Sequence, residues 1–183
     1  MRHVQSTALG LFLDRGFEAV TVEEVAEQSE VSASTVYRYF GTKEGLILHD
    51  EFDDQVIVGL THFLHQGLTP WQAFEGALEL VGDSHFVFEE EATLARIRLC
   101  LEHPSVRAAA HLMLEDMVDE LAEIAARTGS WTFTQARVLL SGIGWAFFAA
   151  LKNWYDAGGE GGWHRHVYEA VETVKRSVSG DSA

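Results

Sequence analysis

Residues 32–43 of the chain, SASTVYRYFGTK, bring together side chains of the kinds that contact nucleic acids. Serine and threonine hydroxyls hydrogen-bond to several bases, and arginine pairs bidentately with guanine. Tyrosine hydroxyls and lysine reach phosphate oxygens. The candidate contacts to double-stranded DNA are Ala33, Ser34, Thr35, Tyr37, Arg38, Tyr39 and Lys43, joined by Thr21 upstream.

Lys43 is the most informative of these residues, because the helix dipole disfavours a cation in a first helical turn. We expect one helix to begin at Thr42 and to run to about His65, which places Lys43 in that turn. An anion bound at the free N–H groups would explain the lysine. Thr21, at the start of another helix, is expected to hold a second phosphate in the same way.

Local signals define the helices that must position these side chains. Thr21 and Glu24 form a capping box, in which the threonine hydroxyl caps a free N–H group and the glutamate reaches back. Ser32 is expected to cap the next helix, and Gly16 to end the first one. The expected helices cover about residues 2–15, 22–28 and 33–40.

The second and third of these helices are short and joined by a tight turn, as in a helix-turn-helix. In that motif the second helix of the pair lies in the DNA major groove and presents its N-terminal residues to base edges. Val36 and Phe40 then fall on the inward face, whereas Tyr37, Arg38 and Tyr39 lie outside it. A mere piece of helical bundle would explain the caps and the apolar face, but not the exposed aromatic and basic residues.

The rest of the chain also carries apolar residues at helical spacing, so the predicted fold class is all-α, with about nine helices. Further helices are expected at about 70–87, 89–102, 105–127, 132–156 and 163–178. We expect an N-terminal three-helix domain containing the helix-turn-helix over residues 1–47, and a C-terminal helical domain over residues 48–183.

The composition limits the function classes. The formal net charge is −15, and residues 1–47 hold four basic against seven acidic side chains, which argues against a protein coated in nucleic acid. The single cysteine, Cys100, cannot form an internal disulfide, which favours a reducing cytoplasm. No apolar run free of charges and breakers is long enough to predict a membrane span, and the N-terminal residues lack the pattern of a secretion signal.

Residues Ala8 to Leu46, ALGLFLDRGFEAVTVEEVAEQSEVSASTVYRYFGTKEGL, resemble the N-terminal domain of TetR-family transcriptional repressors. The resemblance implies a homodimeric repressor that binds a palindromic operator and is released when a small molecule enters its C-terminal domain. It places the family's base-reading and phosphate-holding positions on Ala33, Ser34, Thr35, Tyr37, Arg38, Tyr39 and Lys43. The residues that carry it are Phe12, Gly16, Phe17, Thr21, Val25, Ala26, Val31, Ser32, Thr35, Tyr37, Tyr39, Phe40, Lys43 and Leu46.

Two features depart from the family pattern. Glu30 occupies the turn position that is usually glycine, so a left-handed backbone there would be strained. The basic residues often found before the first helix are reduced to Arg2. Both departures predict weaker or more salt-sensitive DNA binding.

Aromatic residues of the second domain are candidates for a ligand pocket, although aromatic residues at helical spacing are more often core. Arg96 is a further candidate, because an arginine beside an apolar stripe can bind an acidic group of a ligand. The alternative is that its side chain is simply solvated. The stretch WYDAGGEGGW resembles TetR-type regulators that respond to acyl-CoA-like molecules, and a planar aromatic effector suits the tryptophans equally well. The candidate ligand-binding residues are Trp71, Phe74, Phe86, Phe88, Arg96, Trp145 and Phe148.

The stretch LLSGIGWAFFAALKNWY is apolar nearly all round, which predicts a helix buried on two sides. Its glycines and alanines let another helix approach closely. We therefore expect the last two helices to pair with their copies as a four-helix homodimer interface, which is also where the TetR family dimerises.

Other chemistry has little support in the sequence. The pairs His62 with His65 and His164 with His166 can bind zinc, but no cysteine or carboxylate completes either site, so we expect neither a metal nor a cofactor. No nucleophile elbow, phosphate loop or metal-ligand spacing indicates an enzyme. The remaining alternative is a small-molecule-binding dimer that does not bind DNA.

Overall fold

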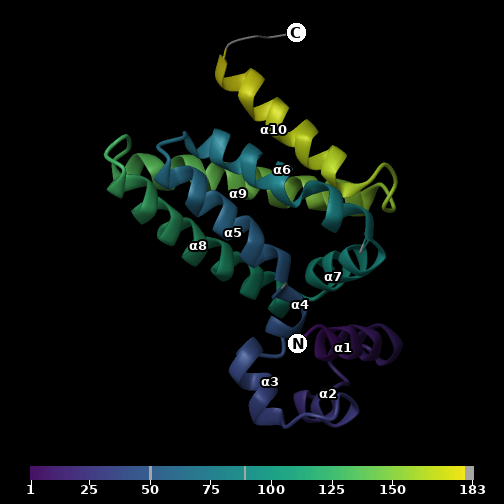
Figure 1. The fold of residues 1–183 in the computed structure, drawn as a ribbon. Helices are drawn as coiled ribbons and strands as arrows, with labels where there is room; N and C mark the ends of the chain where they lie inside the picture. The colour runs from purple at the N-terminus through teal and green to yellow at the C-terminus, as the bar shows by residue number, and fades with distance from the viewer. Residues whose placement is uncertain (50, 89, 180–183) are drawn as a thin grey trace. The chain divides into compact units, whose positions relative to one another are not determined.

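The computed structural model describes residues 1–49, 51–88 and 90–179, without the side chains of residues 51–54, 81–88 and 177–179. Within these ranges the chain forms ten helices and no strand, so the all-α prediction is confirmed (Figure 1). The chain divides into two compact units. The first is Met1–Asp50 with Glu91–His111, and the second is Glu51–Glu90 with Leu112–Ala183.

The first unit contains the expected helix-turn-helix. The predicted bounds of its first three helices are confirmed: α1 (Arg2–Arg15), α2 (Val22–Gln28) and α3 (Ala33–Phe40). The short α4 (Gly45–Leu48) follows, and most of α7 (Glu90–Glu102) and the start of α8 (Pro104–Arg127) complete the unit. Its core is built from Val4, Ala8, Phe12, Phe17, Val20, Val22, Val25, Ala26, Val36, Phe40 and Leu46.

The capping box of α2 forms as the sequence predicts. The Thr21 hydroxyl accepts a hydrogen bond from the Glu24 N–H at 3.2 Å, and the Glu24 carboxylate accepts one from the Thr21 N–H at 2.8 Å. Arg15 at the end of α1 donates to the same carboxylate at 2.8 Å, so one side chain ties the two helices together. These contacts, led by the Arg15 hydrogen bond, lower the pKa of Glu24 from 4.5 to about 2.

The turn between α2 and α3 is a Schellman motif that ends in a strained residue. The Val31 N–H donates to the Ala26 carbonyl at 3.0 Å, and the Glu30 N–H donates to the Glu27 carbonyl at 3.2 Å. This pair of hydrogen bonds requires a left-handed residue between them, a position that glycine usually fills. Glu30 fills it here with φ 56°, as the sequence led us to expect.

The prediction of one continuous helix over Thr42–His65 is wrong. The chain forms a turn, the four-residue α4, an extended residue at His49 (φ −73°, ψ 125°), and then α5 (Glu51–His65). The interruption lies at His49, whose extended backbone ends α4. In the turn before it, a Cβ atom on Gly45 would lie 1.9 Å from the Phe40 carbonyl oxygen. The end of α3 therefore packs directly against the backbone of Gly45, five residues further along the chain.

The second unit is a bundle of long helices. It contains α5, α6 (Pro70–Phe88), the rest of α8, α9 (Phe133–Asp156) and α10 (Trp163–Ser179). In Figure 1, α5 runs beside α6, and α9 runs beside α10. Capping boxes begin α6 and α9: the Thr69 and Thr132 hydroxyls accept from the N–H groups of Gln72 and Gln135 at 3.3 and 3.2 Å.

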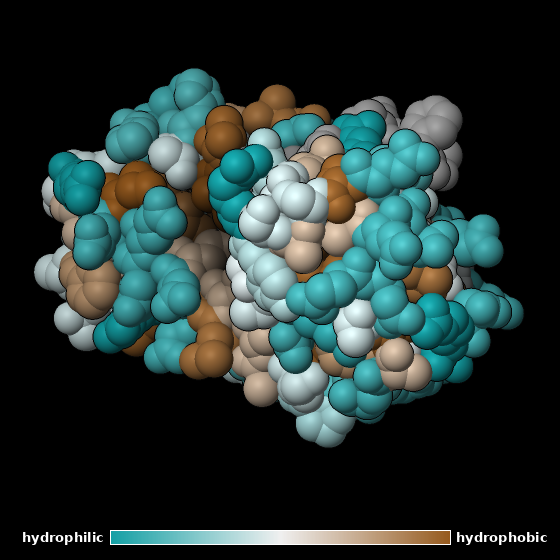
Figure 2. Space-filling model, turned by 90° about the horizontal axis from the view of Figure 1, so that it is seen from below, coloured by the Kyte–Doolittle hydropathy of each residue, from teal (hydrophilic) through white to brown (hydrophobic). Residues whose placement is uncertain are grey.

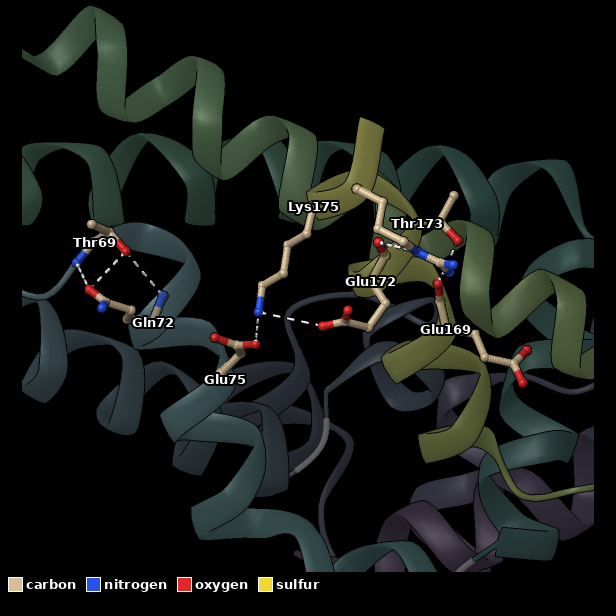
Figure 3. A network of polar contacts seen from close by, with 8 residues as sticks. Thr69, Gln72, Glu75, Glu169, Glu172, Thr173 and Lys175 are labelled. Carbon is tan, nitrogen blue, oxygen red and sulfur yellow. Dashed lines mark hydrogen bonds and ion pairs between the residues drawn. The ribbon is translucent and has the colours of Figure 1, made fainter. Parts of the chain in front are cut away.

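Polar contacts connect helices of the second unit. Lys175 of α10 pairs with Glu75 of α6, which raises the pKa of the lysine, and its ammonium also lies 3.6 Å from Glu172 (Figure 3). Arg137 of α9 binds the Asp119 carboxylate of α8 through two nitrogens, with Nε at 2.6 Å. The exposed α9 and α8 surfaces are thus held in register by a bidentate pair.

The apolar α9 packs on one side and is open on the other. It is the one helix among the described residues long and apolar enough to cross a membrane by length and composition, a test that the core helix of a soluble protein also passes. Leu140 and Ala150 are buried, and a Cβ atom on Gly144 would lie 2.6 Å from Leu114 of α8. Trp145, by contrast, is 47% exposed.

Replacing the strained turn residue should stabilise the protein. We expect Glu30→Gly to raise the free energy of unfolding by about 1 kcal/mol, because glycine adopts φ > 0 without a Cβ clash. Glu30→Gln retains the clash and is the matched control for loss of the charge. Urea unfolding of the three proteins measures the effect; an equal gain in both variants would show that charge, and not backbone strain, limits the turn.

The Glu24 cluster should make stability depend on pH in acid. Because the pKa of Glu24 is lower in the folded protein than its ordinary 4.5, the stabilisation is present above about pH 4.5 and is lost as the pH falls toward 2. We therefore expect Glu24→Gln to be less stable than the parent at about pH 6 and nearly equal to it near pH 2. Urea unfolding at both pH values tests this, with Glu23→Gln, in the same helical turn, as control. A gap that does not narrow in acid would contradict the assignment.

Candidate nucleic-acid interface

The third helix has one buried and one exposed face. Val36 and Phe40 are 1% and 5% exposed and fix α3 to the core of the first unit. Tyr37 and Tyr39 are 45% and 56% exposed, and Arg38 between them is exposed as well. Large aromatic side chains that remain in solvent beside a basic residue form a surface suited to phosphate and base contacts.

Hydroxyl groups cluster at the beginning of α3. The Ser32 side chain accepts a hydrogen bond from the Thr35 N–H at 3.2 Å, so it caps the helix as predicted. The same oxygen lies 2.9 Å from the Ser34 hydroxyl and 2.8 Å from the Thr35 hydroxyl. Ser34 is exposed, while Ala33 and Thr35 are half-buried. The cluster holds two predicted DNA-contacting hydroxyls in fixed places at the end of the helix that enters the groove in a helix-turn-helix.

The basic side chains of the first unit differ in how they are held. Arg15 is committed to Glu24, with which it forms an ion pair at 2.8 Å. The Arg38 guanidinium lies over the Tyr39 ring, 5.3 Å from the ring centroid. Figure 2 shows one face of the molecule, on which hydrophilic residues lie beside smaller hydrophobic patches.

Lys43 does not lie in the first turn of a long helix, as the sequence suggested. It lies in the turn before α4, where the Leu46 N–H donates to the Lys43 carbonyl at 3.2 Å. Its side chain is half-buried, with the ammonium 4.3 Å from the centroid of the Phe17 ring and 5.8 Å from that of Phe12. The argument from the helix dipole therefore does not apply. The Lys43 ammonium is held instead by cation–π contacts with Phe17 and Phe12.

Thr21 is exposed, but its hydroxyl is occupied by the capping box. It accepts from the Glu24 N–H and lies 3.2 Å from the Glu24 carboxylate. A phosphate at this helix start would meet that carboxylate, so the structure gives Thr21 less support as a phosphate contact than it gives Tyr37 or Lys43.

The predicted ligand residues are scattered. Phe74 is buried and meets Phe147 edge to face at 6.2 Å, whereas Trp145 is largely exposed and packs on the half-buried Phe148 at 5.9 Å. Trp71 is half-buried. Arg96 belongs to the first unit, apart from the aromatic candidates. The side chains of Phe86 and Phe88 lie outside the described residues.

Surface grooves of the second unit do not coincide with these candidates. One is lined by Gln55, Val58, Gly59, His62 and Leu80, and another by Trp131, Thr134, Gln135, Val138 and Leu139. None of the predicted ligand residues lines either groove. Among the described residues no cluster of histidine, cysteine or acidic side chains has the arrangement of a metal site.

Sequence reasoning missed several residues that the structure brings together. Phe17 was recognised only as part of the motif, yet it supports Lys43 and contacts His103 at a centroid distance of 5.1 Å. Phe147 lies between Phe74 and Trp163. Its ring centroid is 6.2 Å from that of Phe74 and 6.0 Å from that of Trp163. Phe17 and His103 lie between helices, and helical spacing does not indicate which distant ring either of them, or Phe147, contacts.

Family models match both parts of the chain. The model of the bacterial regulatory proteins of the tetR family matches residues 6–49, and the model of the MftR C-terminal domain matches residues 68–173. The second match alone covers more than half of the chain, and the first covers the helix-turn-helix described above.

Relatives with known names agree with these matches. The HTH-type transcriptional regulator TcmR of Streptomyces glaucescens is 35% identical over 129 residues, which are 67% of this chain and 57% of TcmR. The chain thus matches little more than half the length of TcmR. The HTH-type regulator YdeS of Bacillus subtilis, itself uncharacterised, is 40% identical over 45 residues, which are 25% of this chain and 23% of that protein.

Solved structures share the fold at low sequence identity. Thermus thermophilus FadR, a TetR-family repressor solved with lauroyl-CoA, aligns with a TM-score of 0.56 and 21% identity over 100% of this chain and 95% of its own. A TetR-family regulator from Mesorhizobium loti aligns with a TM-score of 0.50 and 19% identity over 94% and 93% of the two chains. Together with the family matches, the capped α3 and its exposed aromatic and basic face lead to one conclusion: the chain belongs to the TetR family of transcriptional regulators.

Proposed function

We propose that the chain is a transcriptional repressor that binds a palindromic operator as a homodimer and is released by a small hydrophobic ligand. Residues 1–47 form the DNA-binding domain, and residues 48–183 form the ligand-binding and dimerisation domain. The observation that carries the proposal is the amphipathic α3, whose buried Val36 and Phe40 leave Tyr37, Arg38 and Tyr39 in solvent.

The roles of the DNA-binding residues follow from their places on α3. Ser34 and Thr35, at the N-terminal end, face base edges, and Arg38 pairs with guanine. Tyr37, Tyr39 and Lys43 hold phosphates on either side of the groove. Ala33 allows close approach of the backbone, and Thr21 is a weaker phosphate contact because Glu24 lies beside its hydroxyl.

Dimerisation is supported by an exposed apolar face on the last two helices. On α9, Val138 and Trp145 are 67% and 47% exposed, with the exposed Gly142 and Ala149 on neighbouring turns. Tyr168 of α10 is 44% exposed. Side chains of this size in solvent on adjacent helices are typical of a surface that another chain covers, and two symmetric readers suit a palindrome.

A hydrophobic ligand is supported by the interior of the second unit. Phe74, Phe147 and Trp163 form an edge-to-face aromatic row between α6, α9 and α10. Two turns beyond Phe147 on α9, the fully buried Trp154 has an indole N–H with no hydrogen-bond partner within the described residues. This indole N–H could donate a hydrogen bond to the carbonyl oxygen of an acyl thioester. FadR, which shares the fold, binds lauroyl-CoA, and we extend that ligand class to this chain.

Release follows from the energetics of two states. A ligand shifts the balance only by its differential affinity for the DNA-binding and the released forms. The relatives reported above are named as transcriptional regulators, and the function proposed here invokes neither catalysis nor a cofactor. A regulator of this kind acts on DNA in the cytoplasm.

The alternative function is a small-molecule-binding dimer that does not bind DNA. The net charge of −15 and the strained Glu30 favour it, and Arg15 is neutralised by Glu24. The two functions differ in one property, binding to a DNA duplex at low salt.

Operator binding can be tested with a palindromic site selected from a randomised DNA pool. We expect native mass spectrometry to show two chains on each duplex, and added lauroyl-CoA to release them. A dimer that retains an acyl ligand but binds no duplex at low salt would support the alternative. A chain that remains monomeric at micromolar concentration would contradict both.

Lys43 should contribute to DNA binding through its charge. Because two copies face the duplex, we expect Lys43→Ala to reduce the slope of log K against log salt by about two. Lys43→Arg keeps the charge and should keep most of the slope, and Arg127→Ala at the far end of α8 controls for net charge. Fluorescence anisotropy over a salt series measures the slope; an unchanged slope in Lys43→Ala would remove this residue from the interface.

A further inference from the structure

The Lys43 ammonium rests on a ring that touches a third element of the first unit. Phe17 lies 4.3 Å below the lysine nitrogen and 5.1 Å from the His103 ring, measured to ring centroids. His103 follows Phe17 by more than eighty positions in the sequence, yet both belong to the same compact unit. His103, at the junction of α7 and α8, therefore contacts the ring that lies against Lys43, a proposed DNA-binding residue.

The Phe17 ring has little freedom of its own. It is 2% exposed, and Phe12, also 2% exposed, packs against it edge to face at 5.1 Å. In a densely packed core a ring moves only when its neighbours move. The position of the Phe17 ring, on which the Lys43 ammonium lies, is therefore set by the side chains around it, and His103 is one of them.

His103 is fixed to two helices at once. Its N–H donates to the Leu99 carbonyl of α7 at 3.1 Å, and its carbonyl accepts from the Arg107 N–H of α8 at 3.0 Å. Pro104 follows directly as the first residue of α8. From there α8 continues without interruption to Arg127, and its residues from Leu112 onward belong to the second unit.

We propose that His103 is a positioning residue for Lys43, acting through the Phe17 ring. The inference rests on the proposed contact between Lys43 and a DNA phosphate. A displacement or rotation at the start of α8 moves the His103 ring, the Phe17 ring follows, and the ammonium leaves the place where it meets the phosphate. A change at the α7–α8 junction thereby alters the affinity for DNA although no residue of the junction contacts DNA.

A double-mutant cycle separates this role from a general loss of structure. We expect His103→Ala to weaken binding to the selected palindrome by about three- to tenfold, and to have no further effect in a Lys43→Ala background. His103→Phe retains a ring against Phe17 and should restore most of the affinity. Ser105→Ala, in the first turn of α8, is the matched control. Equal weakening by His103→Ala with and without Lys43 would overturn the proposal.

A second readout does not depend on DNA. The chain has only three lysines, Lys43, Lys152 and Lys175, so carbon-13 labelling of lysine gives three resolvable ε-methylene signals, and Lys43→Arg identifies one of them. We expect that signal to be shifted upfield by the Phe17 ring current, and the shift to shrink in His103→Ala but not in Ser105→Ala.

The two readouts keep the inference and the proposed function apart. If the parent protein binds no DNA, the proposed repressor function fails, and the lysine spectrum alone decides whether His103 positions Lys43. If DNA binds but the Lys43 signal does not respond to His103→Ala, the positioning role is wrong and the repressor function stands.

Discussion

The orientation of α3 depends on the burial of Val36 and Phe40. Removing each of these side chains from water is worth roughly 2 kcal/mol, more than any single polar contact on the opposite face. Four residues apart, they define one buried stripe of the helix, and Tyr37, Arg38 and Tyr39 consequently face solvent. The Ser32 cap fixes where the helix begins, and the Schellman turn through Glu30 fixes its direction from α2. The exposed tyrosines and arginine are thus a consequence of the core.

The charges around α3 show how an acidic chain can still bind DNA. Glu24 caps α2 and forms an ion pair with Arg15, so its negative charge is paired with a positive charge of the first unit. Arg38 and Lys43 both lie over aromatic rings, which hold a cation without neutralising it. In the proposed repressor these two positioned cations, and not the net charge, carry the electrostatic part of DNA binding. Such an interface is expected to be sensitive to salt.

Much of the first unit could be predicted because its signals are local. Caps at Thr21 and Ser32 and the end at Gly16 depend on neighbouring residues, so the bounds of α1 to α3 agreed with the structure. The prediction of one helix over Thr42–His65 failed because the backbone is extended at His49, which the helical spacing of the surrounding apolar residues does not reveal. In the second unit, helical spacing did not distinguish the buried Phe74 from the exposed Trp145. The chain breaks after α4, whereas α8 continues without interruption from the first unit into the second.

The most direct test of the account is a map of the DNA-contacting surface. Amide chemical shifts recorded while a palindromic duplex is added at low salt should change most in Ser32–Phe40 and at Lys43, and little in α9 and α10. Binding accompanied by changes confined to other surfaces, with α3 unaffected, would contradict the central claim that this helix reads the operator.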